Sequence, residues 1–269
     1  MGSKQHRIGW TKFALAAVTT AVVGAPLIFT APPARAAGAI GPQGLTWREI
    51  ALLPDWSGAW ALDAKFFAQV VAASGGPDGN PYIPPLTPKY AAFRHANGAA
   101  NGGQGPAGGV KTNSVHCLID GMPGMMSQAY SFEFLFSPGR VTIINDGREI
   151  RRIYTDGRSH MKNSDPTFEG ESIGHWEGDT LAVDTTALLP QSQMFVGMWD
   201  TEQTHVNERI HKIDANTMED DLTVTDPVIF TTPWSYRRTY RKNPLGMSEY
   251  VCEQDNRDAN GVVDLTPPP

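Results

Sequence analysis

The alternation of hydrophobic and polar positions becomes regular from about residue 131 onward. Apolar and polar residues then alternate over short runs, and turn residues separate one run from the next. A period of two is typical of β-strands that bury one face. The runs that predict strands are 131–137, 141–145, 149–154, 172–176, 181–185, 204–213, 218–225, 234–241 and 249–252.

The connections between these runs are short and rich in turn residues, as at Pro138-Gly139 and Asp146-Gly147. Strands joined this tightly are expected to pair antiparallel, because a parallel crossover needs about a dozen connecting residues or more. An earlier run, Asp55–Trp60, predicts one further strand. A total of about nine or ten strands suits a closed up-and-down barrel or a sandwich, and we expect an all-β fold with minor α content.

The segment before residue 131 predicts a cap of helices and loops. Residues 65–73 and 86–95 have helix-like patterns, whereas 74–85 and 97–109 are dense in Gly, Pro and Asn and predict loops over a pocket mouth. We therefore expect four parts. They are a signal peptide over 1–36, a strand with a helical, Gly/Pro-rich cap over 37–110, the barrel over 111–255 and a flexible tail over 256–269.

The first residues have the pattern of an export signal. Basic residues precede an apolar run over 13–29, and Ala34-Arg35-Ala36 supplies the small-x-small cleavage pattern. A membrane anchor is the alternative, but polar residues, Gly24 and Pro26 interrupt the run and no stop-transfer pattern follows. We expect cleavage near Ala37 and a periplasmic or secreted product without a stable membrane anchor.

Charge and cysteine content agree with this location. Four of the 22 basic residues lie in the signal, which leaves 18 against 28 acidic residues in the mature chain. Such an acidic chain repels polyanions, so nucleic acid is not an expected partner. Cys117 and Cys252 are the two cysteines. In an oxidising compartment one disulfide between them is the simplest interpretation, and it would stabilise the fold by roughly 4–5 kcal/mol.

Gly58-Ala59-Trp60 on the first predicted strand, followed by a meander with Arg237 and Arg238 near its end, resembles the lipocalin or calycin barrel. The resemblance implies that Trp60 closes the barrel floor and stacks on an arginine.

A second resemblance covers roughly residues 55–252. Its motifs are CLIDGMPGMM (117–126), YTDGRSH (154–160), SIGHWEGDTLAVDT (172–185) and HVNER (205–209). They are similar to those of a widespread, uncharacterised family of exported bacterial β-barrel proteins, which implies a fold and export but no chemistry. In that family proline usually follows the histidine that matches His160, whereas Met161 follows here, so the local loop shape differs.

The hairpin over 172–185 combines core residues with candidate chemistry. A turn over Glu177–Thr180 pairs Trp176 with Leu181 and His175 with Ala182. Gly174, Trp176, Leu181 and Val183 then share an apolar face, and Ile173, His175, Ala182 and Asp184 share the other. The second face either lines a lumen or cleft or faces solvent. A carboxylate beside a histidine fixes its tautomer and raises its basicity, as a general base requires.

The run Tyr154–His160 ends one predicted strand and enters a loop. At a barrel mouth it would present the Tyr154 phenol, the Asp156 carboxylate and the His160 imidazole to one ligand, to polarise a carbonyl, move a proton and hold an anion respectively. The alternative is a turn in which Asp156 accepts from backbone amides and Arg158 is a surface charge.

Two further groups complete the candidates. If 204–213 is a strand, His205, Asn207, Arg209 and His211 share one face, mostly exposed, and Glu208 lies on the other. His116-Cys117 with Met122, Met125 and Met126 offers soft ligands for Cu(I), although methionine more often fills apolar gaps. Short His-x-His and Cys-x-x-Cys pairs and phosphate-binding loops are missing from the sequence, so we expect neither a metal nor a cofactor.

The sequence therefore predicts a cofactor-free enzyme that performs acid–base chemistry on a small, partly apolar molecule inside the barrel. Water elimination, isomerisation or hydrolysis would each fit. A passive carrier of an apolar ligand is the alternative, and copper handling is a third possibility. The predicted catalytic residues are His175 or His160 as base, Tyr154 as proton donor, and Asp156 or Asp184 as orienting carboxylate. The predicted substrate contacts are Arg158, Trp176, Met125, Met126 and His205.

Overall fold

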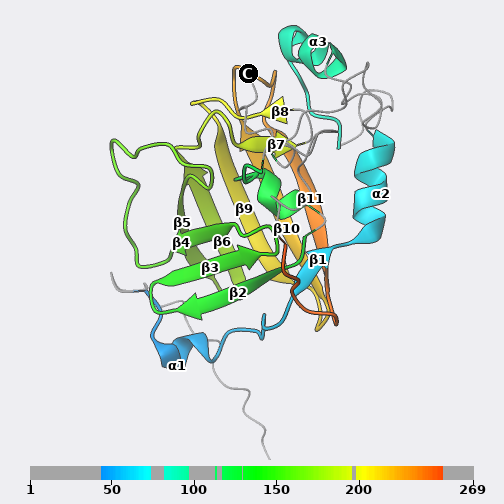
Figure 1. The fold of residues 1–269 in the computed structure, drawn as a ribbon. Coiled ribbons are helices and arrows are strands. Elements are labelled where there is room, and N and C mark those ends of the chain that lie inside the picture. The colour runs from blue at the N-terminus through cyan, green and yellow to red at the C-terminus, as the bar shows by residue number, and fades with distance from the viewer. Residues whose placement is uncertain are drawn as a thin grey trace, which may run out of the picture. The chain divides into compact units, whose positions relative to one another are not determined.

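Nine strands form a closed barrel in the computed structural model, in the order β1-β11-β10-β9-β6-β5-β4-β3-β2 (Figure 1). The structure describes residues 44–73, 82–96, 113, 117–128, 130–195 and 198–250. Within these residues the chain is mostly β with few helices, which confirms the predicted fold class.

The barrel strands follow the predicted runs closely. They are β1 (Trp60–Leu62), β2 (Phe132–Ser137), β3 (Arg140–Asn145), β4 (Ile150–Tyr154), β5 (Glu171–Glu177), β6 (Thr180–Thr186), β9 (His205–Lys212), β10 (Thr217–Thr225) and β11 (Trp234–Lys242). Outside the barrel lie β7 (Gln193–Phe195), β8 (Met198–Trp199), α1 (Trp47–Ile50), α2 (Ala64–Ala73), α3 (Pro88–Ala96) and a short 3-10 helix, η3 (Gly124–Ser127).

One strand pair departs from the antiparallel prediction. β4 and β5 pair parallel, with Ile153 opposite Ser172 and Tyr154 opposite Ile173. The connection over 155–170 is long enough for this crossover without a helix. An odd number of strands also requires it, because strand direction alternates around an all-antiparallel ring and such a ring closes only with an even number. The expectation of antiparallel pairing throughout is therefore wrong at this pair.

The barrel closes through a short strand. β1 pairs with β11 over three residues and with β2 only through Trp60 and Phe132. It begins at Trp60, so residues 55–59, which were predicted as strand, are not part of it, although the Ala59 carbonyl accepts from the Asn243 N–H at 2.7 Å. Trp60 is fully buried, and its indole Nε1 donates to the Trp56 carbonyl at 2.9 Å. The ammonium groups of Lys212 and Lys242 lie over the Trp60 ring.

The interior of the barrel is filled by side chains. Large aromatic residues pack edge to face there, as Trp56 does against Phe134 and Trp176 with ring centroids 4.9 and 5.4 Å apart. Contacts of this kind add to the free energy gained from burying apolar area. The apolar cluster continues over strands from both halves of the chain, including Ile143 and Ile210.

Four ionisable side chains are also buried in this interior. Glu208 accepts hydrogen bonds from Arg151 and from Arg238, and Arg238 Nη2 lies 2.7 Å from Asp220 Oδ2. Burial disfavours the ionised form of Glu208, but the guanidinium groups of Arg151 and Arg238 outweigh it, and the pKa of Glu208 is lowered. We call Arg151, Glu208, Asp220 and Arg238 the inner ion cluster.

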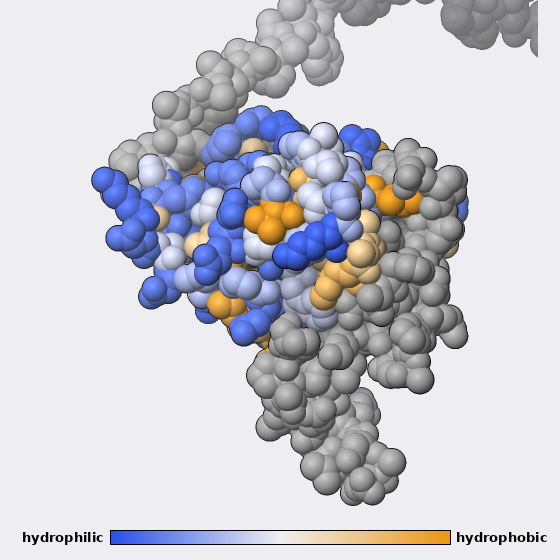
Figure 2. Space-filling view, turned by 90° about the horizontal axis from the view of Figure 1, so that it is seen from above, coloured by the Kyte–Doolittle hydropathy of each residue, from blue (hydrophilic) through white to orange (hydrophobic). Residues whose placement is uncertain are grey.

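The two predicted helices are confirmed as α2 and α3, each close to its predicted bounds. Phe66 of α2 stacks on Tyr236 of β11 at a centroid distance of 6.5 Å. The chain entering α3 bonds to the segment after β10, where Thr87 N donates to the Ile229 carbonyl. In Figure 1, α3, β7 and β8 lie at one end of the barrel and α1 lies at the other. Seen from above, the described surface is mainly hydrophilic with small hydrophobic patches (Figure 2).

Several predictions fall outside the described residues. They are the signal peptide over 1–36, most of the loops over 74–85 and 97–109, His116, Cys252 and the tail over 256–269. The disulfide and export therefore stay predictions. Residues 249–250, which opened the last predicted strand, are not in a strand. No helix among the described residues is long and apolar enough to cross a membrane.

Candidate functional site

Several of the predicted site residues meet on the outer surface of the barrel. Asp184 lies in β6 opposite Asn207 of β9, and its neighbours Val183 and Thr185 are buried. Because side chains alternate along a strand, Asp184 points outward. His205 begins β9, and His160 reaches the same place from the loop between β4 and β5. We call His160, Glu171, Asp184 and His205 the outer histidine cluster.

Asp184 is the centre of this cluster. Its Oδ1 accepts a hydrogen bond from Asn207 Nδ2 at 3.0 Å and also contacts His205 Nε2. Its Oδ2 lies 3.3 Å from His160 Nε2. One carboxylate thus bridges two imidazoles that come from separate segments of the chain.

His160 has a carboxylate at each ring nitrogen. Its Nδ1 lies 3.0 Å from Glu171 Oε2 and 3.2 Å from Thr186 Oγ1. Glu171 Oε2 also accepts from the backbone N–H of Met161 at 3.1 Å, so it holds both the ring and the loop that carries it. His160 therefore connects the two carboxylates, and each of its ring nitrogens already has a partner.

His205 is different, because the described residues engage only its Nε2. No hydrogen-bond partner of its Nδ1 is found among the described residues, and its side chain is 40% exposed. A carboxylate on one nitrogen fixes the tautomer, and the other nitrogen is then open to take a proton. This is the arrangement of a general base.

His175 does not join the cluster. Its side chain is 66% exposed, and its Nε2 lies 2.9 Å from Glu177 Oε1. The predicted pairing with Ala182 is confirmed, as is the apolar face of the hairpin. Of the two alternatives for the polar face, the structure shows the outer surface. The placement of this chemistry inside the barrel is therefore wrong for His175 and Asp184, since the interior face of these strands carries the core.

Tyr154, Asp156 and Arg158 form a group of their own at the end of β4. Arg158 Nε lies 2.9 Å from Asp156 Oδ1, and its guanidinium lies 4.0 Å from the centre of the Tyr154 ring. The hydrogen bond from Arg158 lowers the pKa of Asp156. Asp156 also accepts from the backbone N–H of Arg158 at 3.3 Å, as in the turn that was the alternative.

The remaining predicted contacts lie in the core. Trp176 is on the inward face of β5, and Met125 and Met126 are buried in η3. The Tyr240 hydroxyl donates to the Met126 carbonyl at 2.9 Å, which fixes η3 inside the end of the barrel. Within the described part of the chain no group of three or more His, Cys, Asp and Glu side chains is arranged to hold a metal ion.

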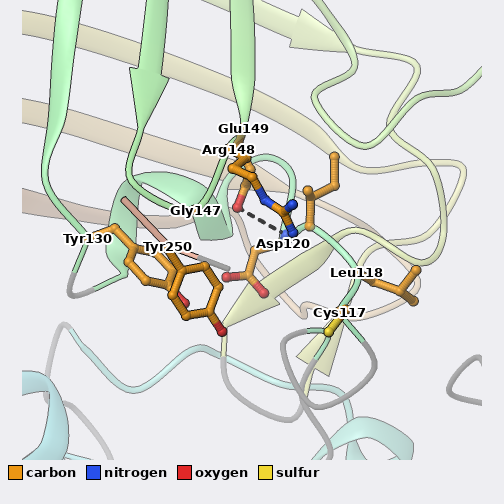
Figure 3. Close-up of a pocket in the computed structure, with 9 residues that line it drawn as sticks. Cys117, Leu118, Asp120, Tyr130, Gly147, Arg148, Glu149 and Tyr250 are labelled. Carbon is orange, nitrogen blue, oxygen red and sulfur yellow. Dashed lines mark hydrogen bonds between the residues drawn. The ribbon is translucent and has the colours of Figure 1, made fainter. Parts of the chain in front are cut away.

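A second group was not singled out from the sequence. It surrounds a cavity of about 30 Å³ between the turn after β3 and the loop over 117–121 (Figure 3). Both Glu149 oxygens accept backbone N–H groups, from Asp120 at 3.1 Å and from Gly121 at 2.9 Å. Burial raises the pKa of Asp120 to about 7, and burial together with the Asp120 charge raises that of Glu149 to about 8.

Asp120 and Glu149 each lie next to turn residues in the sequence, in Asp120-Gly121 and Arg148-Glu149. A carboxylate in such a turn is ordinarily exposed. No local pattern brings two such turns together. The only signal in the sequence was the apolar context on one side of each acid, at Ile119 and Ile150.

Comparison with known proteins assigns no function. No protein-family model matches the chain, and no curated protein is similar to it.

Proposed function

We propose that the protein is an exported enzyme that transfers protons to and from a small, partly apolar molecule at the outer histidine cluster. Water elimination, isomerisation and hydrolysis all belong to this class. One observation carries the proposal: Asp184 engages one nitrogen of His205, and the other, on an accessible surface, has no hydrogen-bond partner among the described residues.

The geometry gives each residue a role. Asp184 accepts the Nε2 proton of His205, so the lone pair is on Nδ1 and can take a proton from a carbon beside a carbonyl or from water. The Asp184 charge then stabilises the imidazolium until the proton is returned. His160 engages the second oxygen of Asp184 and acts as a positioning residue. A proton-transfer group placed in this way contributes typically about 10²–10⁴-fold in rate.

The surroundings support a partly apolar substrate. Met161 follows His160 directly and its side chain is 64% exposed. Ile173, which is half-buried, lies opposite Asp184 on the outer face of the hairpin. An apolar part of a substrate can therefore bind beside the cluster while its reactive group meets His205.

The arrangement of charge and packing favours catalysis over carriage. A carrier would hold its apolar ligand inside the barrel, and that interior is occupied by tightly packed side chains such as Trp56, Phe134 and Trp176. The accessible imidazoles and carboxylates gather instead on the outside.

The test compares His205→Ala with His175→Ala. Both histidines lie on the outer face, but only His205 is in the cluster. The probes are p-nitrophenyl acetate and butyrate for hydrolysis, and deuterium exchange into 2-butanone for proton abstraction. We expect His205→Ala to lose about 10²–10⁴-fold of the protein-dependent rate on at least one probe and His175→Ala to retain it.

Two results would contradict the proposal. One is a wild-type rate equal to that of buffer on every probe. The other is an equal loss in both variants, which would mean that any exposed imidazole gives the observed rate.

A further inference from the structure

The cavity beside Asp120 and Glu149 is lined by two buried carboxyls, and Arg148 also lines it. Asp120 and Glu149 are only 4% and 2% exposed. Among the described residues, Asp120 Oδ1 has no hydrogen-bond partner. A buried carboxylate without a compensating cation is costly, so the cavity favours a positively charged ligand that donates hydrogen bonds.

The walls of the cavity fit the same kind of ligand. The rings of Tyr130 and Tyr250 lie with centroids 5.4 Å apart, and Figure 3 shows the Asp120 carboxyl pointing to the side on which they lie. Aromatic faces attract cations, most strongly where water is excluded. Both Glu149 oxygens already accept backbone N–H groups, so the open acceptor is Asp120 Oδ1.

The size of the cavity limits the ligand. Its volume is about 30 Å³, more than the roughly 10–15 Å³ that a cavity needs to hold one water molecule. An ammonium group is of that size, whereas a guanidinium or a quaternary ammonium is larger. We propose that this cavity, which we call the tyrosine–carboxyl pocket, binds a primary ammonium group, either of a free alkylamine or of a lysine side chain. This site is separate from the outer histidine cluster and does not depend on the function proposed there.

Binding of an ammonium group at this pocket depends on the ionisation of Asp120 and Glu149. The pKa of Asp120 is raised to about 7 by burial, and that of Glu149 to about 8 by burial and by Asp120. Glu169 raises the pKa of Glu149 further, and the exposed Arg148 lies at the pocket edge. An ammonium ion pairs best with ionised carboxyls, so binding releases protons and strengthens as pH rises from about 6 to about 8.5.

The experiment is calorimetric titration of the full-length protein. The probes are n-butylammonium chloride for a free amine and N-acetyl-lysine methylamide for a lysine side chain, with n-butanol as the uncharged control. We expect one or both cations to bind at about pH 8.5, about tenfold or more weakly at about pH 6.0, and n-butanol not to bind. The probe that binds more tightly identifies the source of the ammonium group.

Variants of the lining residues distinguish the effect of the carboxylate charge on binding from the effect of side-chain shape. Asp120→Asn keeps the size of the side chain and should weaken binding at least about tenfold, whereas Asp179→Asn in the exposed β5–β6 turn should leave it unchanged. Tyr250→Phe keeps the ring and should bind within about twofold of wild type, and Tyr250→Leu should bind more weakly.

The proposal is overturned if neither cation binds at the higher pH, if affinity is equal at the two pH values, or if Asp120→Asn binds as wild type does. His205→Ala should bind both probes normally. A failure of the pocket is therefore distinguishable from a failure of the outer histidine cluster.

Discussion

The two oxygens of Asp184 serve different parts of the chain. Oδ1 contacts His205 and Asn207 on β9, and Oδ2 meets His160 on the loop between β4 and β5. The loop and the barrel wall are therefore held by one carboxylate. Any change that moves the loop also moves the group that orients His205.

A glycine holds the other site in place. Gly121 has φ +73°, and a Cβ built there would lie 2.2 Å from the Phe168 carbonyl oxygen. Its N–H donates to Glu149, and the next residue, Met122, donates to the same Phe168 carbonyl. Only glycine combines this backbone conformation with this close approach.

We predict that Gly121→Ala destabilises the protein far more than Gly178→Ala. Gly178 has φ +63°, but among the described residues no atom lies within 4 Å of the place that a Cβ would take, so it isolates the backbone effect. That effect costs about 1–2 kcal/mol. The clash at Gly121 should add at least about 2 kcal/mol, measured as the difference in free energy of unfolding in urea. Equal losses would show that the loop over 117–121 yields to a methyl group.

Residue types alone identified part of the outer cluster. His160 and Asp184 were predicted as catalytic residues, and His205 was predicted as a substrate contact. Glu171 was missed, since its role depends on a loop that folds back. His175 was favoured because alternation tells which residues share a face, but the polar face of a hairpin is compatible with either a lumen or solvent.

At the scale of elements, β9 links the two polar clusters. Outward residues such as His205 and Asn207 face the outer histidine cluster, whereas Glu208 between Asn207 and Arg209 points into the inner ion cluster. The alternation predicted for this strand is confirmed. The buried contacts of Glu208 therefore hold in place the strand that carries His205.

We predict that Glu208→Gln destabilises the fold by about 3–5 kcal/mol, because it removes the negative charge that faces the buried guanidinium groups of Arg151 and Arg238. Glu202→Gln makes the same chemical change at an exposed position nearby and should change stability by less than about 0.5 kcal/mol. Chemical denaturation measures both. A loss below about 1 kcal/mol in Glu208→Gln would contradict the role given to the inner ion cluster.

The strands were predictable because alternation and turn residues are local signals. The parallel pair of β4 and β5 was not, since it is decided by closure of the whole ring. β7 and β8 are too short to show a period, and the start of β1 depends on which residues find a partner in β11.

For the whole molecule, buried acids set the response to pH. The folded pKa values of Asp120 and Glu149, about 7 and about 8, lie above their ordinary values of 3.8 and 4.5. Their contribution to stability is complete below about pH 4, where both states are protonated. As pH rises, the unfolded chain releases the protons of Asp120 and Glu149 at lower pH than the folded protein does. The stability that the two protonated carboxyls contribute is therefore lost progressively up to about pH 8.

We predict that the free energy of unfolding falls between about pH 5.0 and about pH 8.5. Acids with lowered pKa values, such as Asp63 and Asp156, are ionised throughout this range and add no slope. In Asp120→Asn the fall should be smaller by about 3 kcal/mol, and Asp179→Asn should match wild type. A wild-type stability that rises with pH, or an identical slope in Asp120→Asn, would contradict this account.

The claim that Asp184 and His205 act as one catalytic unit is tested most directly by a double-mutant cycle. The measurement is the rate on the best probe substrate for His205→Ala, Asp184→Asn and the double variant. If the two residues act together, the double variant loses no more than His205→Ala alone. Losses that multiply, or an Asp184→Asn variant as active as wild type, would contradict the claim.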